Sequence, residues 1–146
     1  MSNTTLMKNL LAGAALFVLG ALTVWLARPT AVEAQSPRVY ELRTYRCLPG
    51  RLEALKTRFR DHTLKLFAKH GMKNIGYWVP ADAPDSQNTL IYIIAHDSRA
   101  AAEKSWSEFR DDTEWKTVRD ASEKDGKIVE KVESVYMTAA DFSPLK

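Results

Sequence analysis

The chain has 146 residues, enough for one ordinary domain, and 45% of them are hydrophobic, enough for a packed core. Its formal net charge is only +3, and its Lys and Arg residues form no basic stripe, so a nucleic-acid-binding protein is disfavoured. Cys47 is the single cysteine of the sequence, so no disulfide can form within the chain.

The N-terminal segment has the pattern of an export signal. Lys8 is followed by an uncharged apolar run over residues 9–27, and a Val-x-Ala motif ends at Ala34. The run is long for a signal peptide and just long enough to cross a bilayer. We therefore predict that residues 1–34 are either a cleaved signal peptide or an N-terminal transmembrane anchor. With Lys8 retained inside, both outcomes place the rest of the chain outside the cytoplasm, in the periplasm or secreted.

After a short linker over residues 35–38, the hydrophobic pattern alternates between strand and helix periods. Leu52, Leu55 and Phe59 share one helical stripe, and Gly71 stands where that helix should end. The pattern predicts strands over residues 38–47, 72–80, 89–96 and 127–137, a helix over 51–70, a helix from 98 to about 110, and a short helix recapped at 111–113 that ends near 126.

The predicted order is therefore β-α-β-β-α-β with a broken second helix, which is the ferredoxin-like motif of the α+β class. Its helices cover one face of an antiparallel sheet. The other face would carry Ile, Val and Tyr side chains alongside charges, and a patch of that size is usually covered by a partner. We therefore expect a homodimer in which two sheets face each other as a dimeric α+β barrel.

Four short motifs in a fixed order resemble the NIPSNAP family. They are Val39 to Tyr45 followed by Pro49-Gly50, then Gly76-Tyr77-Trp78, then Asp111 to Trp115, and finally Asp141 to Pro144. The resemblance covers residues 39–144. It implies the dimeric α+β barrel fold and no settled activity.

The first strand brings together the strongest candidates for a ligand site. Alternation places Glu41, Arg43 and Tyr45 on one face. If that face is the barrel interior, they form a buried charge pair beside a phenol, which can orient a polar ligand. The alternative is a salt bridge that only fixes strand pairing or the dimer. Tyr77 and Trp78 point to opposite faces of the second strand, so one should be a core residue and the other should line the interior.

Two histidines are weaker candidates. His96 ends the third strand just before a helix cap, where it is a candidate catalytic base or simply a hydrogen-bonded residue. His70 is a candidate axial ligand for haem, whereas its spacing of eight from His62 prevents the two from holding one metal. The sequence contains no phosphate loop, CxxC, HExxH or GxSxG motif, so nucleophilic and metal-dependent hydrolysis are disfavoured and we expect no metal and no cofactor.

Two hypotheses of different classes remain open. The first is an exported homodimer that binds a small apolar or amphipathic ligand, or a protein partner, without catalysis. The second is an enzyme, either a cofactor-independent monooxygenase or a haem-dependent one, by analogy with other dimeric α+β barrels. The second needs a base such as His96 in one cavity with Arg43 and Tyr45.

Overall fold

The computed structural model describes residues 38–145, so the predicted export segment lies outside the described residues. The elements follow the predicted order. They are β1 (Val39–Cys47), α1 (Leu52–Arg58), the π-helical turn η1 (Phe59–Thr63), α2 (Leu64–Lys69), β2 (Lys73–Trp78), the 3-10 turn η2 (Asp85–Gln87), β3 (Thr89–His96), α3 (Arg99–Asp111), α4 (Thr113–Ser122) and β4 (Val129–Thr138).

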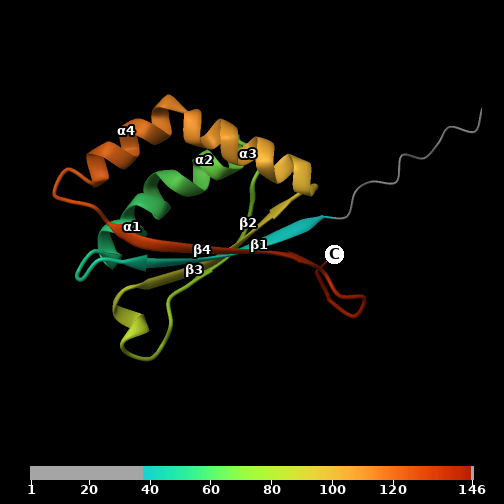
Figure 1. Cartoon of the computed structure of the whole chain (residues 1–146), viewed down its shortest axis with the longest axis horizontal. Helices are drawn as coiled ribbons and strands as arrows, with labels where there is room; N and C mark the ends of the chain where they lie inside the picture. The colour runs from blue at the N-terminus through green and yellow to red at the C-terminus, as the bar shows by residue number, and fades with distance from the viewer. Residues whose placement is uncertain (1–37, 146) are drawn as a thin grey trace, which may run out of the picture. The chain divides into compact units, whose positions relative to one another are not determined.

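The strands form one antiparallel sheet in the order β2-β3-β1-β4. The helices lie on one side of this sheet, with α3 and α4 farthest from it (Figure 1). Strand β3, which the sequence shows as apolar on both faces, pairs with β1 on one side and β2 on the other. The fold is therefore α+β, as predicted.

The contacts of β1 show which of its faces lies under the helices. Glu41 receives a hydrogen bond from the Trp106 indole of α3, and the Tyr45 ring packs edge-on against Phe59 of η1. The sequence left open which face would be the barrel interior. The structure places Glu41, Arg43 and Tyr45 on the helix-covered face, so a pocket between two facing sheets does not contain them. The opposite, open face carries Leu42 and its cross-strand partners Ile93 and Val135.

The first helix differs from the continuous helix predicted over residues 51–70. The turn η1 inserts a π-helical segment, and the Thr63 hydroxyl donates a 3.2 Å hydrogen bond to the Arg58 carbonyl there. Phe59 and Leu66 both remain buried. The helix ends at Gly71, whose φ of +76° is readily adopted only by glycine, as the sequence predicted.

The break in the second helix is also where the sequence predicted it. Asp112 leaves the helical conformation, and its carboxylate accepts hydrogen bonds from the backbone N–H groups of Glu114 and Trp115, which starts α4. Trp115 then packs on Phe109 with ring centroids 4.5 Å apart, so the two short helices share one aromatic layer over the sheet. Within residues 38–145, no helix is both long and apolar enough to span a bilayer.

Candidate ligand-binding site

The carboxylate of Glu41 lies at the centre of a buried polar network. The side chain is fully buried, and four donors from four different elements reach it. They are Trp106 Nε1 of α3 at 2.6 Å, His96 Nε2 of β3 at 3.1 Å, Ser134 Oγ of β4 at 2.6 Å and Arg43 NH1 of β1 at 2.6 Å. Burial alone would raise the pKa of Glu41, but these hydrogen bonds outweigh it and lower the pKa to about 2.

Arg43 connects this network to solvent. Its side chain is 16% exposed, and its guanidinium lies 4.2 Å from the centre of one Trp106 ring. It also lies 5.5 Å from the Tyr45 ring centroid, with NH2 3.5 Å from the Tyr45 hydroxyl. Its Nε–H is buried and has no hydrogen-bond partner among the described residues. Arg43 is thus held in place by Glu41 while its Nε–H is unused.

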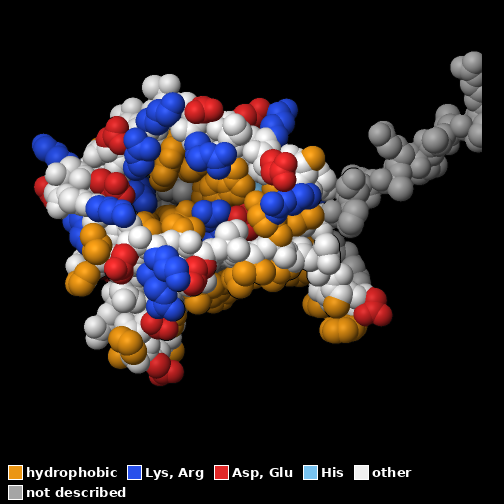
Figure 2. Space-filling view, viewed as in Figure 1, with side chains coloured by type: hydrophobic (Ala, Val, Ile, Leu, Met, Phe, Trp, Pro, Cys, Tyr) orange, Lys and Arg blue, Asp and Glu red, His pale blue; other side chains and the backbone are white. Residues whose placement is uncertain are grey.

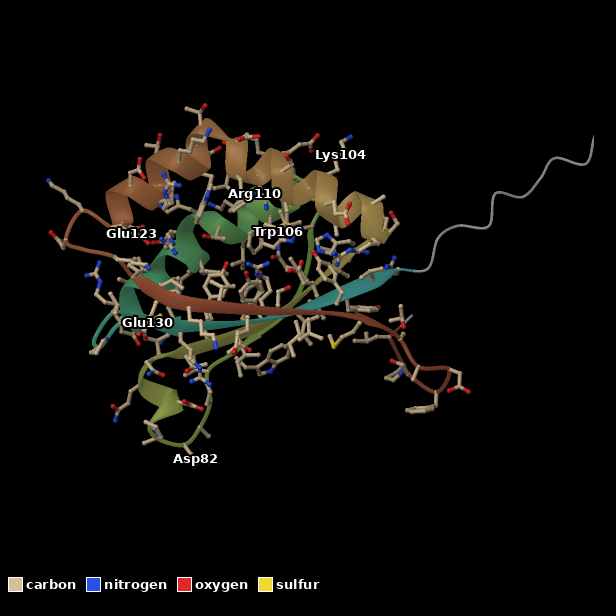
Figure 3. The ribbon with its side chains drawn as sticks, in the orientation of Figure 1. Asp82, Lys104, Trp106, Arg110, Glu123 and Glu130 are labelled. Carbon is tan, nitrogen blue, oxygen red and sulfur yellow. The ribbon has the colours of Figure 1, made fainter. Side chains whose placement is uncertain are left out.

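An open cleft leads to these residues from the β4 edge of the sheet. Val132 and Ser134 lie on the helix side of β4, yet both are exposed. Helix α3 contacts this strand farther along, where the Arg99 guanidinium lies 3.5 Å from the Tyr136 ring centroid. Figure 2 shows the hollow between α3–α4 and β4, with hydrophobic side chains inside it and Lys and Arg side chains around its rim. Trp106 lies on the underside of α3, between that helix and β4 (Figure 3).

The two aromatic residues predicted on β2 do point to opposite faces. Tyr77 is on the helix side, stacked on Tyr92 at 5.3 Å between ring centroids, and its hydroxyl donates to Asn74 Oδ1. Trp78 is on the open face, where it is 51% exposed and lies over Gly76. Tyr77 therefore belongs to the same layer as Arg43, whereas Trp78 lies on the other side of the sheet.

Both candidate histidines are paired with carboxylates. His96 is buried, and its Nε2 is bonded to Glu41, so the ring does not face the cleft. His70 lies at the end of α2, with Nε2 2.7 Å from the Asp112 carboxylate and its ring edge-on to Phe109. Within the described part of the chain, no group of three or more His, Cys, Asp or Glu residues could hold a metal ion.

Sequence reasoning missed three members of the site. Trp106 was not a candidate, although an indole N–H needs a hydrogen-bond acceptor when it is buried. Ser134 lies two residues after Val132 on β4, so both side chains are on the helix side of the sheet. Ser134 pairs there with Arg43 of β1. Tyr92 is the one tyrosine of strand β3, and a phenol between isoleucines on both sides was the available signal.

Replacing Glu41 by Gln tests the network. The amide is neutral and cannot serve all four donors as an acceptor, so Arg43 is left as a buried charge without its partner. We expect the free energy of unfolding at pH 7 to fall by about 3 kcal/mol, measured by urea denaturation at fixed protein concentration. Because folding lowers the pKa of Glu41, the wild-type advantage is complete above its ordinary value of 4.5 and is lost as pH falls toward about 2.

The matched control is Glu53→Gln, which removes an exposed ion pair with Lys56 on α1. We expect it to change the free energy of unfolding by less than about 0.5 kcal/mol. Equal, small losses in the two variants would contradict a stabilising role for the Glu41 network.

Comparison with known proteins identifies the family. The NIPSNAP family model matches residues 40–144. A NIPSNAP family protein of unknown function from Agrobacterium tumefaciens is 25% identical, with a TM-score of 0.65 over 75% of this chain and 95% of that one. A second NIPSNAP family protein from the same organism is 22% identical, with a TM-score of 0.66 over 76% and 93%.

A more distant neighbour shares only the fold. SnoaB, a cofactor-independent oxygenase from Streptomyces nogalater, is 13% identical, with a TM-score of 0.51 over 75% of this chain and 99% of that one. No curated protein sequence matches the chain. The family match spans nearly all of the described residues, and the chain belongs to the NIPSNAP family.

Proposed function

We propose that this protein is an exported homodimer whose protomers each bind a small, largely apolar ligand in the cleft between the sheet and α3–α4. The proposal rests on the position of the Arg43 side chain. Its guanidinium lies between aromatic rings at the bottom of the cleft, part-exposed, with Nε unpartnered among the described residues. A mostly apolar cleft with a few fixed polar groups is the usual form of a small-molecule site.

The walls of the cleft favour a ligand with a large apolar part. Trp106 comes from α3 and Tyr45 from β1, and both rings lie against Arg43, while Val132 is exposed on the helix side of β4. Aromatic rings give a large contact area at a low entropy cost, because each has only two side-chain torsions to fix. Inside the cleft, the polar groups are Arg43 and its neighbours, so the ligand is amphipathic rather than strongly charged.

The monooxygenase alternative is less well supported by the geometry. A cofactor-independent oxygenase needs a base in contact with its substrate, but the candidate base His96 is buried behind Glu41. Glu41 itself, with a pKa of about 2, is a poor proton acceptor. The similarity to SnoaB is one of fold alone. A haem-dependent enzyme would require His70 to release Asp112. Binding without catalysis therefore fits the site better.

The open face of the sheet supports a homodimer. On this face Val135 is 55% exposed and Trp78 is 51% exposed, while Leu42, Ile91 and Ile93 are half-buried. Figure 2 shows hydrophobic side chains along the lower side of the sheet, away from the helices. A contiguous apolar face of this kind marks an interaction surface, and a second copy offers the same face in return.

The dimer is tested by placing a charge on the open face. Val135→Glu buries a carboxylate without a partner if two sheets face each other, so we expect a monomer by analytical ultracentrifugation at a concentration where the wild type is a dimer. The control is Val132→Glu, the same substitution on the same strand but on the helix side, which should remain a dimer. A wild-type monomer, or a Val135→Glu dimer, would refute the two-sheet interface.

The cleft is tested with N-phenyl-1-naphthylamine, a neutral apolar dye whose fluorescence rises on burial. We expect saturable binding to the wild-type dimer, and binding at least about 10-fold weaker in Val132→Glu, because a bound apolar ligand would desolvate the new carboxylate. Val132→Thr keeps the shape of the side chain and should bind within about 2-fold of the wild type. Equal binding by all three proteins would place the dye elsewhere.

Export is tested on the full chain in a Gram-negative host. We expect added protease to reach the domain once the outer membrane is opened, whether residues 1–34 are cleaved or retained as an anchor. Phe17→Arg places a charge in the apolar run and should leave the chain protected inside the cell. Phe142→Arg, in the C-terminal segment, is the control and should be exported. Protection of the wild-type chain would contradict export.

A further inference from the structure

A second cavity lies at the other edge of the sheet from the cleft beside β4. Strands β2 and β4 are the two edges of the sheet, so β3 and β1 separate the two sites. The cavity has a volume of about 250 Å³, and Lys56 and Arg60 are the charged residues beside it. Its apolar walls are formed by Phe59, Leu64, Tyr77, Trp78 and Leu90. Because Arg60 and Trp78 are exposed, the cavity opens to solvent between α1 and β2.

Both walls of this cavity depart from regular secondary structure. The helical wall contains the π-helical turn η1, and such turns occur frequently at functional sites. In the strand wall, the register of β2 against β3 shifts between Asn74 and Gly76, so Ile75 is an extra residue on β2. Such β-bulges are also over-represented next to active sites, where they redirect a side chain. Two independent irregularities therefore border one cavity.

Asn74 joins the two walls of the cavity. Its Nδ2 donates a 3.0 Å hydrogen bond to the Leu64 carbonyl, and its Oδ1 accepts a hydrogen bond from the Tyr77 hydroxyl. Leu64 lies on the helical wall and Tyr77 on the strand wall. The Phe59 ring packs edge-on against Tyr77, with 5.8 Å between ring centroids. The walls are therefore held in place before a ligand arrives, which lowers the entropy cost of binding.

The mouth of the cavity carries one positive charge that is available to a ligand. Lys56 Nζ is 2.7 Å from the Glu53 carboxylate, so this pair has no net charge. The Arg60 side chain is exposed and forms no ion pair or hydrogen bond with any residue in 38–145. Asp61 follows it in the sequence but does not line the cavity. A guanidinium matches the two oxygens of a carboxylate, whose single negative charge equals the charge of Arg60.

The volume of the cavity limits the apolar part of the ligand. A group the size of a water molecule occupies about 30 Å³, so 250 Å³ has room for roughly eight such groups. An alkyl chain of about seven carbon atoms fills this space and leaves its charged end at the mouth. The lining offers apolar contacts along the chain from Phe59, Leu64 and Leu90.

We propose that the cavity at the β2 edge binds a monocarboxylate with an alkyl chain of about this length, with the carboxylate beside Arg60. This site goes beyond the proposed function, because it is a second ligand site in each protomer. Of the residues that line it, Trp78 alone lies on the open face of the sheet. A dimer of two facing sheets therefore leaves the mouth on the helix side accessible.

Octanoate tests the inference, with octanol and octylammonium as probes of the same chain length that are neutral and positively charged. Each is titrated into the protein and followed by two-dimensional NMR of the backbone amides. We expect octanoate to shift the amide signals of η1 and β2 saturably. Its Kd should be about 3- to 5-fold lower than that of octanol, which is the gain expected from one exposed ion pair. Octylammonium should bind more weakly than octanol.

Two arginine variants locate the carboxylate. Arg60→Gln should bind octanol as the wild type does but lose the preference for octanoate. Arg110→Gln removes the same charge from an exposed position on α3 that does not line the cavity, so it should keep the preference. Both side chains are exposed, so neither variant should lower the melting temperature by more than about 2 °C.

Three outcomes would overturn the inference. The first is equal binding of octanoate and octanol by the wild type, or an undiminished preference in Arg60→Gln. The second is a set of shifts confined to the β4 cleft, around Val132 and Ser134, which would place octanoate in the first site instead. The third is no binding of octanoate, which would remove the second site while the dye experiment on the β4 cleft still decides the proposed function.

Discussion

The buried carboxylate of Glu41 is the interaction on which the arrangement of the site depends. Its donors come from β1, β3, β4 and α3, so a single side chain connects three strands to the helix above them. Burying a carboxylate is unfavourable unless its hydrogen bonds and charge are satisfied, and here four donors, one of them the Arg43 guanidinium, do both. The pKa of Glu41 falls to about 2 because these hydrogen bonds outweigh the effect of burial, which alone would raise it.

The same carboxylate determines what the site presents to solvent. It binds Arg43 through NH1, which fixes the guanidinium against Trp106 and directs the rest of it toward Tyr45 and Tyr92. It also binds His96, which keeps the histidine away from the cleft. The network is therefore closed to solvent at His96 and open to solvent beside β4. This asymmetry is why the site fits a binding role better than acid–base catalysis.

Much of the fold could be predicted from local patterns. The element order, the end of the first helix at Gly71 and the recapping at Asp112 each follow from residues a few positions apart. Alternation along β1 was enough to place Glu41 and Arg43 on one face. It could not say which face the helices cover, because both faces of that strand mix apolar and polar residues.

The contacts that complete the site join distant parts of the chain. Trp106 is 65 residues from Glu41, and Ser134 is 93 residues from it. No periodicity encodes such pairs, so neither residue was a candidate. The π-helical turn was also hidden, because the apolar stripe of Leu55, Phe59 and Leu66 continues across it.

The protonation of Glu41 in the folded protein tests the account most directly. Carbon-13 NMR of the side-chain carboxyl, followed from pH 7 downward and assigned with Glu41→Gln, reports the pKa of this one group. We expect an ionised carboxylate whose signal does not titrate until the pH approaches about 2 or the protein unfolds. A titration near the ordinary value of 4.5 in the folded protein would show that the four donors do not hold the carboxylate, and the arrangement of Arg43 and the cleft would lose its basis.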